Sequence, residues 1–448
     1  MKYYIKTFGC QMNVYDSQRI ARILQNMGHT PAASPAEADL IIFNTCHIRE
    51  KAAEKLFSDL GRINLIKEER KAAGLETIIG VVGCVVQAED GEIARRAPFV
   101  NFATGPLTYY RIPEILQKIA RDKDLCIIDT EFTAESKFDH LPENRSEGAC
   151  SYLAVQEGCN NFCTYCVVPY TRGIETSRPV EEVLHEARRL VETGSVELNL
   201  LGQNVNSYHG ADGSGKERSL AYLLHKLAEI DGLKRIRYTT SYPADMTDEL
   251  INCHRDIPQL MPYLHLPVQS GSDKILKAMN RRHNRAQYLD IIEKLYAANP
   301  ALRMSSDFIV GFPGESDEDF EQTLDIVRRV GYIQAFSFKY SKRPGTPAAL
   351  MPEQVEEKIK RQRLDILQEL LSGMQLKFNR ECLGKTMPVL FEYKGRRAGQ
   401  LVGRTPYMQN IHVEIGKEFL NQIVDIKVTE AATSSLSGAC TTLNNKAS

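Results

Sequence analysis

Short apolar runs that alternate with amphipathic segments most constrain the fold of this chain. Near the amino terminus, residues 3–9, 39–46 and 77–84 have strand patterns, and the second and third of these are almost entirely apolar. Strands that are apolar on both faces are typical of parallel sheets covered by helices. The segments between them, such as residues 48–73, have helical patterns. The first hundred or so residues therefore predict a doubly wound α/β domain.

A cysteine follows each of these three strands. Cys10, Cys46 and Cys84 come within about two residues of the strands' carboxyl ends. Open parallel sheets bind ligands beyond this edge, so the topology brings the three thiols together. The chain has eleven cysteines and its start lacks a secretory leader, which favours metal binding or catalysis over disulfides. The three residues predict a shared metal ion or cluster.

A second series of strands and helices begins near residue 149. The strand patterns cover residues 151–159, 196–204, 235–243, 263–269, 303–315 and 335–341. Ser316 with Asp319 three residues on is a capping-box signature for one of the intervening helices. Six strand–helix units in this order predict a full or partial parallel barrel, whose active site lies at the carboxyl ends of the strands.

The last part of the chain has a different pattern. A mostly polar helix at about 353–378 is followed by short alternating strands, at residues 386–393, 399–405, 410–415 and 421–431. These strands predict a small OB-like β-barrel. The run "ATSSLSGACTTLNNKAS" from residue 432 on is rich in Ser, Thr, Ala and Asn and is predicted to be disordered.

The segment "EGCNNFCTYCVVPYTRG", residues 157–173, contains Cys159, Cys163 and Cys166. Zinc is one interpretation, but structural zinc sites take four ligands, usually as two pairs, and no second pair follows. An iron–sulfur cluster is the other interpretation. A four-iron cluster held by three thiolates leaves one iron open for an exogenous ligand. The spacing, with Tyr165 before the last cysteine, favours the cluster.

This motif after the first strand of a barrel resembles that of the radical S-adenosylmethionine superfamily. The motifs "FGCQMN", "NTCHIRE" and "LLGQNVNSY" resemble those of one family in this superfamily, the methylthiotransferases. The resemblance covers nearly the whole chain, to about residue 440. The motifs around Cys46 and Cys84 differ from the usual family motif at His47, Val85 and Val86, but the cysteines themselves are present. The resemblance implies an N-terminal methylthiotransferase domain, a linker, a radical S-adenosylmethionine core, a TRAM RNA-binding domain and a disordered tail. Their expected bounds are residues 1–118, 119–144, 145–376, 377–441 and 442–448.

The resemblance also implies two [4Fe-4S] clusters and S-adenosylmethionine as cofactors. Cys159, Cys163 and Cys166 would hold the cluster that binds and cleaves S-adenosylmethionine to a 5′-deoxyadenosyl radical. The auxiliary cluster on Cys10, Cys46 and Cys84 would supply the sulfur, which a second S-adenosylmethionine methylates. A radical is required because carbon 2 of adenine carries an unactivated C–H bond.

Within the family, the chain is most similar to enzymes that convert N6-(dimethylallyl)adenosine at position 37 of tRNA to its 2-methylthio derivative. Three alternatives stay open: a methylthiotransferase for N6-threonylcarbamoyladenosine tRNA, one for a ribosomal-protein aspartate, and a non-catalytic zinc- and RNA-binding protein. The implied partners are the tRNA anticodon loop, an electron donor such as flavodoxin or ferredoxin, and proteins that supply sulfur and clusters. No apolar run approaches the roughly 20 residues of a membrane span, so a cytoplasmic location is expected.

Further candidate residues lie at strand ends or in the last barrel. Gly202, Gln203 and Asn204 are expected near the methionine part of S-adenosylmethionine, and Ser305 and Asp307 near its ribose hydroxyls. Other candidates at the carboxyl ends of the predicted barrel strands are Gly311, Phe312, Gly314, His265, Gln269 and Ser270. The net charge of −1 does not attract RNA to the whole molecule, so a local basic surface is needed. The candidates for RNA contact are Lys394, Arg396, Arg397, Arg404, Tyr407 and His412. Capped strand ends and a solvated charged face are the alternatives for these residues.

Overall fold

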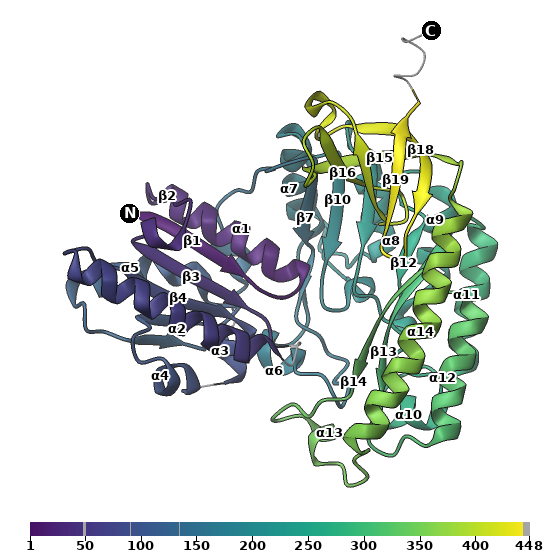
Figure 1. The fold of residues 1–448 in the computed structure, drawn as a ribbon, viewed down its shortest axis with the longest axis horizontal. Helices are drawn as coiled ribbons and strands as arrows, with labels where there is room; N and C mark the ends of the chain where they lie inside the picture. The colour runs from purple at the N-terminus through teal and green to yellow at the C-terminus, as the bar shows by residue number, and fades with distance from the viewer. Residues whose placement is uncertain (48–50, 90, 134, 442–448) are drawn as a thin grey trace. The chain divides into compact units, whose positions relative to one another are not determined.

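The computed structural model describes residues 1–47, 51–89, 91–133 and 135–441, so the predicted tail at 442–448 lies outside it (Figure 1). The chain forms two compact units. The first contains residues 1–144, 156–162 and 166–178, and the second contains residues 145–155, 163–165 and those from 179 on. In the described part of the chain, no helix is long and apolar enough to cross a membrane.

The first unit contains a six-stranded sheet in the order β2-β1-β3-β4-β5-β6, and every neighbouring pair is parallel. Its strands are β1 Lys2–Thr7, β2 Thr30–Pro31, β3 Leu40–Thr45, β4 Ile78–Gly83, β5 Phe102–Thr104 and β6 Ile127–Asp129. The main helices are α1 Gln11–Asn26, α2 Lys51–Ala72 and α5 Ile112–Arg121. Ile41 and Phe43 of β3 pack with α2, whereas Leu40 and Ile42 pack with α1 and α5. Helices cover both faces, which confirms the doubly wound fold.

The sheet extends further along the chain than the sequence pattern indicated. Residues 119–144 were expected to form a linker, but β6 lies within them and pairs with β5. This strand is only three residues long and none of its residues is fully buried, and the apolar run at residues 125–128 that leads into it was not interpreted as a strand. Edge strands are held mainly by backbone hydrogen bonds, which leave little trace in the sequence.

The second unit contains six parallel strands that surround a barrel-like interior. They form two sheets, β11-β10-β7 and β12-β13-β14, which approach each other at a parallel bridge between Ile236 and Leu260. The strands are β7 Cys150–Ala154, β10 Glu197–Leu201, β11 Arg235–Tyr238, β12 Tyr263–His265, β13 Arg303–Val310 and β14 Gln334–Lys339. The helices between them are α7 Val180–Glu192, α8 Leu220–Ala228, α9 Asp248–Asp256, α10 Asp273–Ala278, α11 Arg285–Ala298 and α12 Asp317–Val330. The capping box of Ser316 and Asp319 begins α12, as predicted.

The two faces of these strands differ in polarity. Alternate residues, among them Leu198, Ile236 and Phe308, pack against the surrounding helices in one large core. The intervening residues face the other way, and many of them are polar, including Glu197, Asn199, Arg237, His265 and Asp307. Parallel barrels usually fill this interior with branched apolar side chains. A polar interior is therefore available for binding and chemistry.

The C-terminal part of the second unit is a closed five-stranded barrel in the order β15-β16-β17-β19-β18. It follows helix α14, Glu357–Glu381, and its strands are β15 Thr386–Lys394, β16 Gln400–Arg404, β17 Asn410–Glu414, β18 Ile423–Ala431 and β19 Ser435–Cys440. The expectation of disorder from residue 432 on is wrong for β19, which pairs with both β17 and β18. Small residues such as Ser437 and Gly438 fit between two neighbouring strands, and Leu436 is buried in the barrel.

A buried histidine in the second unit makes a pH-dependent contribution to stability. His254 on α9 is buried and its Nε2 lies 2.7 Å from the Tyr238 hydroxyl. Burial lowers its pKa from 6.5 to about 4, because the protonated ring is disfavoured in the folded protein. The free energy of unfolding is therefore highest above pH 6.5 and decreases as the pH falls towards 4, where the unfolded chain binds the proton more readily. We expect the loss to reach roughly 3 kcal/mol. Urea unfolding of the wild type and His254→Gln between pH 7.5 and 4.5 should show a shallower pH dependence in the variant; the exposed His185→Gln should match the wild type.

Candidate active site

The first cysteine set lies at the carboxyl edge of three adjacent strands in the first unit. Cys10 follows β1, Cys46 follows β3 and Cys84 follows β4, and these strands are neighbours in the order β1-β3-β4. None of the three forms a disulfide in the described structure; Cys46 and Cys84 are buried and Cys10 is partly buried. The parallel topology therefore brings the three predicted ligands to one place, as expected.

Two glycines allow the loops that carry these thiols to approach closely. Gly9 has φ +119°, and a Cβ there would lie 2.3 Å from the Cβ of Cys46. Gly83 has φ +106°, and a Cβ there would lie 2.4 Å from the carbonyl oxygen of Thr45. Any side chain at either position would push the strand ends apart, because both the space and the backbone conformation favour glycine.

A buried pair of amides orients the first of these thiols. The Cys10 thiol donates to Oδ1 of Asn13 at 3.2 Å, and Nδ2 of Asn13 donates to Oδ1 of Asn44 at 3.0 Å. Asn44 in turn donates to the Asn13 carbonyl oxygen at 2.8 Å and to Oγ of Ser17 at 2.9 Å. This bond needs the protonated thiol, because a thiolate has no hydrogen to donate to the amide oxygen, so it positions Cys10 before iron binds.

The surroundings favour the thiolate at Cys10 and oppose it at Cys84. The pKa of Cys10 is lowered to about 6, because the Cys46 side chain hydrogen-bonds to it and the Arg172 guanidinium lies nearby. Burial raises the pKa of Cys84, and Arg172 opposes that rise. Thiolates are the form that binds iron. Three converging thiols beside a fixed positive charge therefore fit an iron–sulfur cluster, which carries negative charge when bound by thiolates.

Arg172 belongs to a buried network of four charges within the first unit. It lies on helix α6, Val168–Arg172, shortly after the second cysteine motif. Its guanidinium donates to Asp16 at 2.9 Å and to Glu157 at 2.5 Å, and Lys137 bridges the same carboxylates at 3.0 and 2.8 Å. None of the four side chains is more than 5% exposed. Burial opposes ionisation of Asp16, but Lys137 and Arg172 outweigh it and lower the pKa of this carboxyl.

The second cysteine set lies in the loop between β8, Gln156–Glu157, and α6. Each of its sulfurs accepts a hydrogen bond from nitrogen: Cys159 from Nδ2 of Asn161 at 3.6 Å, and Cys166 from the backbone of Val168 at 3.5 Å. Cys163 accepts from Nη1 of Arg281 at 3.7 Å. Donors aimed at sulfur stabilise thiolates, so the surroundings of each sulfur suit a ligand of an iron–sulfur cluster. The loop follows β8 rather than β7, because the predicted strand at 151–159 is interrupted at Val155.

The short piece of this loop that belongs to the second unit is held by backbone contacts. Thr164 donates through its amide to Met279 at 3.1 Å and through its hydroxyl to Ala278 at 2.9 Å, and its carbonyl accepts from Ala348 at 2.9 Å. The predicted cofactor residue Tyr165 is partly buried and packs against the cluster that contains Phe312. Phe162, one residue before Cys163, has φ +45°. A bulky residue rarely adopts this conformation, and such strain concentrates at functional sites.

The predicted S-adenosylmethionine residues lie in the second unit on β10 and β13. Gly202, Gln203 and Asn204 directly follow β10, and Nδ2 of Asn204 donates to Asp245 at 2.7 Å. Ser305 and Asp307 were expected at a strand end, whereas β13 continues to Val310. Ser305 is fully buried; Asp307 is 31% exposed and therefore more accessible to a ligand.

His265 connects these two residues. Its Nδ1 lies 2.9 Å from Oγ of Ser305, and its Nε2 lies 3.6 Å from Oδ2 of Asp307. The other residues predicted at the carboxyl ends of these strands mainly contact neighbouring strands, helices and core side chains. Gln269 bridges to β13, Ser270 is buried against Thr323, and Phe312 is in a core cluster. Gly311 and Gly314 have φ +69° and +79°, and the Gly311 amide donates to Glu315 at 2.8 Å.

A second cluster of charges lies at the opposite, amino-terminal end of the strands. Cys150, Glu197 and Glu392 offer ligand atoms within 4.8 Å of one another, a geometry that suits a metal ion. However, Glu197 pairs with Arg237 at 3.0 Å and with Arg235 at 3.5 Å, and these partners lower its pKa despite burial. The same arginines donate to four carbonyl groups of the C-terminal barrel, those of Pro388, Arg404, Thr405 and Pro406. The cluster therefore anchors this barrel and needs no cation.

The predicted RNA-contact residues are spread over the C-terminal barrel. Lys394, Arg396 and Arg397 are exposed at the end of β15 and in the loop after it, and the described residues supply no ion-pair partner to them. Arg404 pairs with Glu392 at 3.4 Å, so its charge is partly neutralised. His412 is partly buried on β17. Tyr407 packs edge-on against Phe378 and lines a cavity of about 750 Å³ beside Lys234 and Lys385.

Four residues beside the thiols were not predicted from the sequence: Asn13, Asn44, Arg172 and Arg281. Asn13 and Asn44 lie in the quoted words around Cys10 and Cys46, so their nearness to the thiols was a usable signal. Arg281 is more than a hundred residues from Cys163 along the chain, and no local pattern marks it. Only the fold brings its guanidinium to that sulfur.

Three family descriptions match the chain. Residues 2–105 match Uncharacterized protein family UPF0004, residues 153–327 match the radical SAM superfamily and residues 380–440 match the TRAM domain. A solved radical S-adenosylmethionine methyltransferase, TsrM from Kitasatospora setae, has a TM-score of 0.56 at 11% identity, over 90% of this chain and 80% of that one. The cobalamin-dependent S-adenosylmethionine radical enzyme OxsB has a TM-score of 0.53 at 12% identity, over 83% of this chain and 56% of that one. At these identities the likeness concerns the fold.

With its two sets of three thiols, this architecture defines a radical SAM protein with an N-terminal UPF0004 domain and a C-terminal TRAM domain. A curated relative from Rickettsia felis is 55% identical over 98% of this chain and 99% of its own length, and one from Rickettsia bellii is 54% identical over 98% of both. Both are named tRNA-2-methylthio-N(6)-dimethylallyladenosine synthase. The chain belongs to this family.

Proposed function

We propose that this enzyme converts N6-(dimethylallyl)adenosine at position 37 of tRNA to its 2-methylthio derivative. The observation that supports the proposal is the presence of two sets of three cysteines: Arg172 lies near Cys10 in the first set, and each sulfur of the second accepts a hydrogen bond from nitrogen. A methylthio transfer to an unactivated carbon needs two open coordination sites, one for radical generation and one for sulfur. Identity to the named relatives supports the choice of substrate.

Two [4Fe-4S] clusters and S-adenosylmethionine are the proposed cofactors. Cys159, Cys163 and Cys166 hold one cluster, and Cys10, Cys46 and Cys84 hold the other. When bound, these groups supply the one-electron cleavage of S-adenosylmethionine, the sulfur and the methyl group. The protein's own contribution is to orient the ligands: Asn13 accepts a hydrogen bond from the Cys10 thiol before a cluster is bound, and Arg281 donates to the sulfur of Cys163. Gly202, Gln203 and Asn204 are proposed to bind the methionine part of S-adenosylmethionine, and Asp307, supported by Ser305 through His265, its ribose hydroxyls.

The proposed tRNA contacts are Lys394, Arg396, Arg397 and Arg404 of the TRAM domain. The first three are exposed and unpaired within the described chain, and small barrels of this type bind nucleic acid through such cations. An anticodon loop suits the enzyme because its unpaired bases can be turned out into a pocket. We further propose an electron donor such as flavodoxin or ferredoxin, sulfur- and cluster-supply proteins as partners, and the cytoplasm, where tRNA is modified, as the location.

Mass spectrometry of tRNA nucleosides tests this function. A strain without the gene should lack the 2-methylthio derivative of N6-(dimethylallyl)adenosine and accumulate its precursor, and the gene should restore the product. If only a 2-methylthio derivative of threonylcarbamoyladenosine vanishes, or only a modified ribosomal-protein aspartate, the substrate is wrong. The anaerobically purified protein should hold about eight iron atoms per chain. A colourless protein with zinc would instead support a non-catalytic RNA-binding role.

A further inference from the structure

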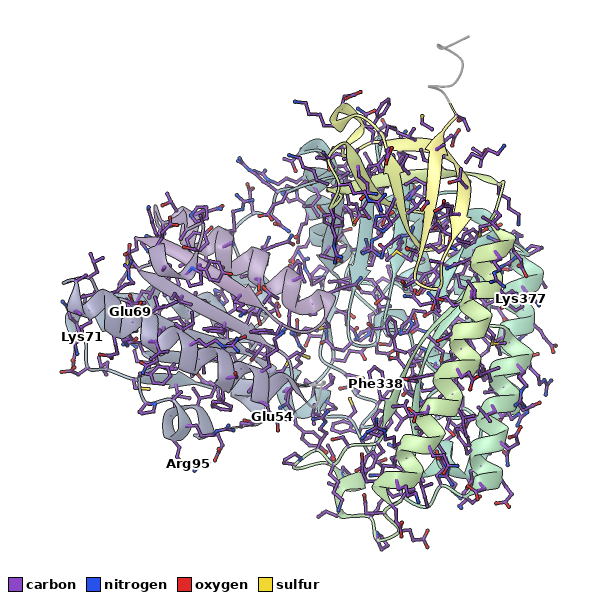
Figure 2. The ribbon with its side chains drawn as sticks, in the orientation of Figure 1. Glu54, Glu69, Lys71, Arg95, Phe338 and Lys377 are labelled. Atoms are coloured by element: carbon purple, nitrogen blue, oxygen red, sulfur yellow. The ribbon has the colours of Figure 1, made fainter. Side chains whose placement is uncertain are left out.

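The interior face of β14 carries two exposed phenylalanines, Phe336 and Phe338. Each is 46% exposed, whereas Phe308 on the neighbouring strand is fully buried. Ala335, between Gln334 and Phe336, packs into the core on the opposite face of the strand. Phe338 is labelled in Figure 2. Large aromatic side chains that stay exposed on a polar interior face are typical of binding sites.

Both phenylalanines lie beside the polar residues of β13. The parallel register places Phe336 opposite Asp307 and Phe338 opposite Ile309, so these side chains share one face. The ring of His265 meets Phe336 nearly edge-on, with centroids 6.2 Å apart and planes inclined by 72°. A polar group of His265, Ser305 and Asp307 is therefore continuous with an apolar surface of Phe336, Ile309 and Phe338.

We infer that Phe336 and Phe338 bind the dimethylallyl group of the substrate adenosine and determine the enzyme's preference for it. The inference rests on the proposed function. Asp307 is proposed to hold the ribose of S-adenosylmethionine, and the adenine to be modified must lie next to that ribose for hydrogen transfer. The apolar surface beside Asp307 is then where the N6 substituent of this adenine reaches, and a five-carbon apolar chain suits two exposed rings.

The same surface disfavours the alternative substrate. A threonylcarbamoyl group carries a carboxylate and a hydroxyl, both of which need polar or cationic partners when water is removed. The residues opposite the two phenylalanines are Asp307 and Ile309, an anion and an apolar chain. The Asp307 carboxylate repels a second carboxylate, and the rings offer it no hydrogen bond. The site thus combines attraction for one substituent with repulsion of the other.

Binding to two anticodon stem-loop RNAs that differ only in the dimethylallyl group tests the inference. The cluster-loaded full chain with S-adenosylmethionine is titrated with each RNA, and the ratio of the two Kd values is the readout. We expect Phe338→Ala and Phe336→Ala each to reduce the preference for the prenylated RNA about tenfold, with little change in Kd for the other RNA. Phe338→Leu, which keeps an apolar side chain, should retain most of the preference. The matched control is Leu65→Ala, at an exposed position on α2.

The outcomes separate this inference from the proposed function. Suppose that the wild type prefers and methylthiolates the prenylated RNA, but both alanine variants have the same ratio of the two Kd values as the wild type. The inference is then overturned and the proposed function stands. If the wild type neither distinguishes the two RNAs nor forms a methylthio product, both are overturned. An equal loss of affinity for both RNAs in the alanine variants, at unchanged iron content, also overturns the inference, because it indicates a general structural role.

Discussion

The Cys163→Ala variant is expected to cleave S-adenosylmethionine more than about a hundredfold more slowly than the wild type. Removing one of three thiolates leaves two protein ligands, which do not hold a four-iron cluster with a single open iron. The guanidinium of Arg281, 3.7 Å from this sulfur, would also lose one hydrogen-bond acceptor, while it keeps its bond to the Pro267 carbonyl at 2.6 Å. Formation of 5′-deoxyadenosine under anaerobic conditions with a chemical reductant measures the effect.

A matched pair of variants shows whether the loss is specific. Cys253→Ala removes another buried thiol of the second unit, one that hydrogen-bonds to carbonyl oxygens and belongs to neither proposed cluster. It should retain cleavage. Cys46→Ala should also retain cleavage but form no methylthio product, because its thiol belongs to the auxiliary set. Methylthiolation by a verified Cys46→Ala protein would refute the role of that set.

Replacement of Arg172 by methionine is expected to destabilise the first unit by about 3–5 kcal/mol. In the wild type, two carboxylates are balanced by two cations, and all four side chains are almost completely buried. Methionine leaves Asp16 and Glu157 with only Lys137, so one buried negative charge is uncompensated. Urea unfolding, combined with hydrogen exchange to localise the change to residues 1–144, measures the loss.

Two further variants test this explanation. Arg172→Met combined with Glu157→Gln removes one charge of each sign, so it should recover part of the lost stability. Arg95→Met interrupts a pair with Glu92 on the surface, where Arg95 is 70% exposed, and should unfold like the wild type (Figure 2). Equal destabilisation of the single and the double variant would show that Arg172 acts through packing rather than charge.

Much of the fold is predictable from local patterns, because burial imposes a period on the sequence. The continuous apolar runs of β3 and β4 and the capping box of α12 each correspond to an element at the expected place. β6 and β19 were not predicted as strands, since one is a three-residue edge strand and the other consists mainly of small residues. Their pairing depends on backbone hydrogen bonds to strands already in place.

The sequence by itself determined the chemistry: six cysteines in two sets of three, at the strand ends and spacing that suit two open iron–sulfur clusters. The spacing of ligands within a loop or after a strand is a local property, so it can be recognised in the sequence. Only the tertiary structure decided which charges accompany the thiols, through Arg172 and Arg281, and which residues line the barrel interior, through Asp307, Phe336 and Phe338. Those groups come from distant segments, and their proximity results from the parallel register of strands and the burial of paired charges.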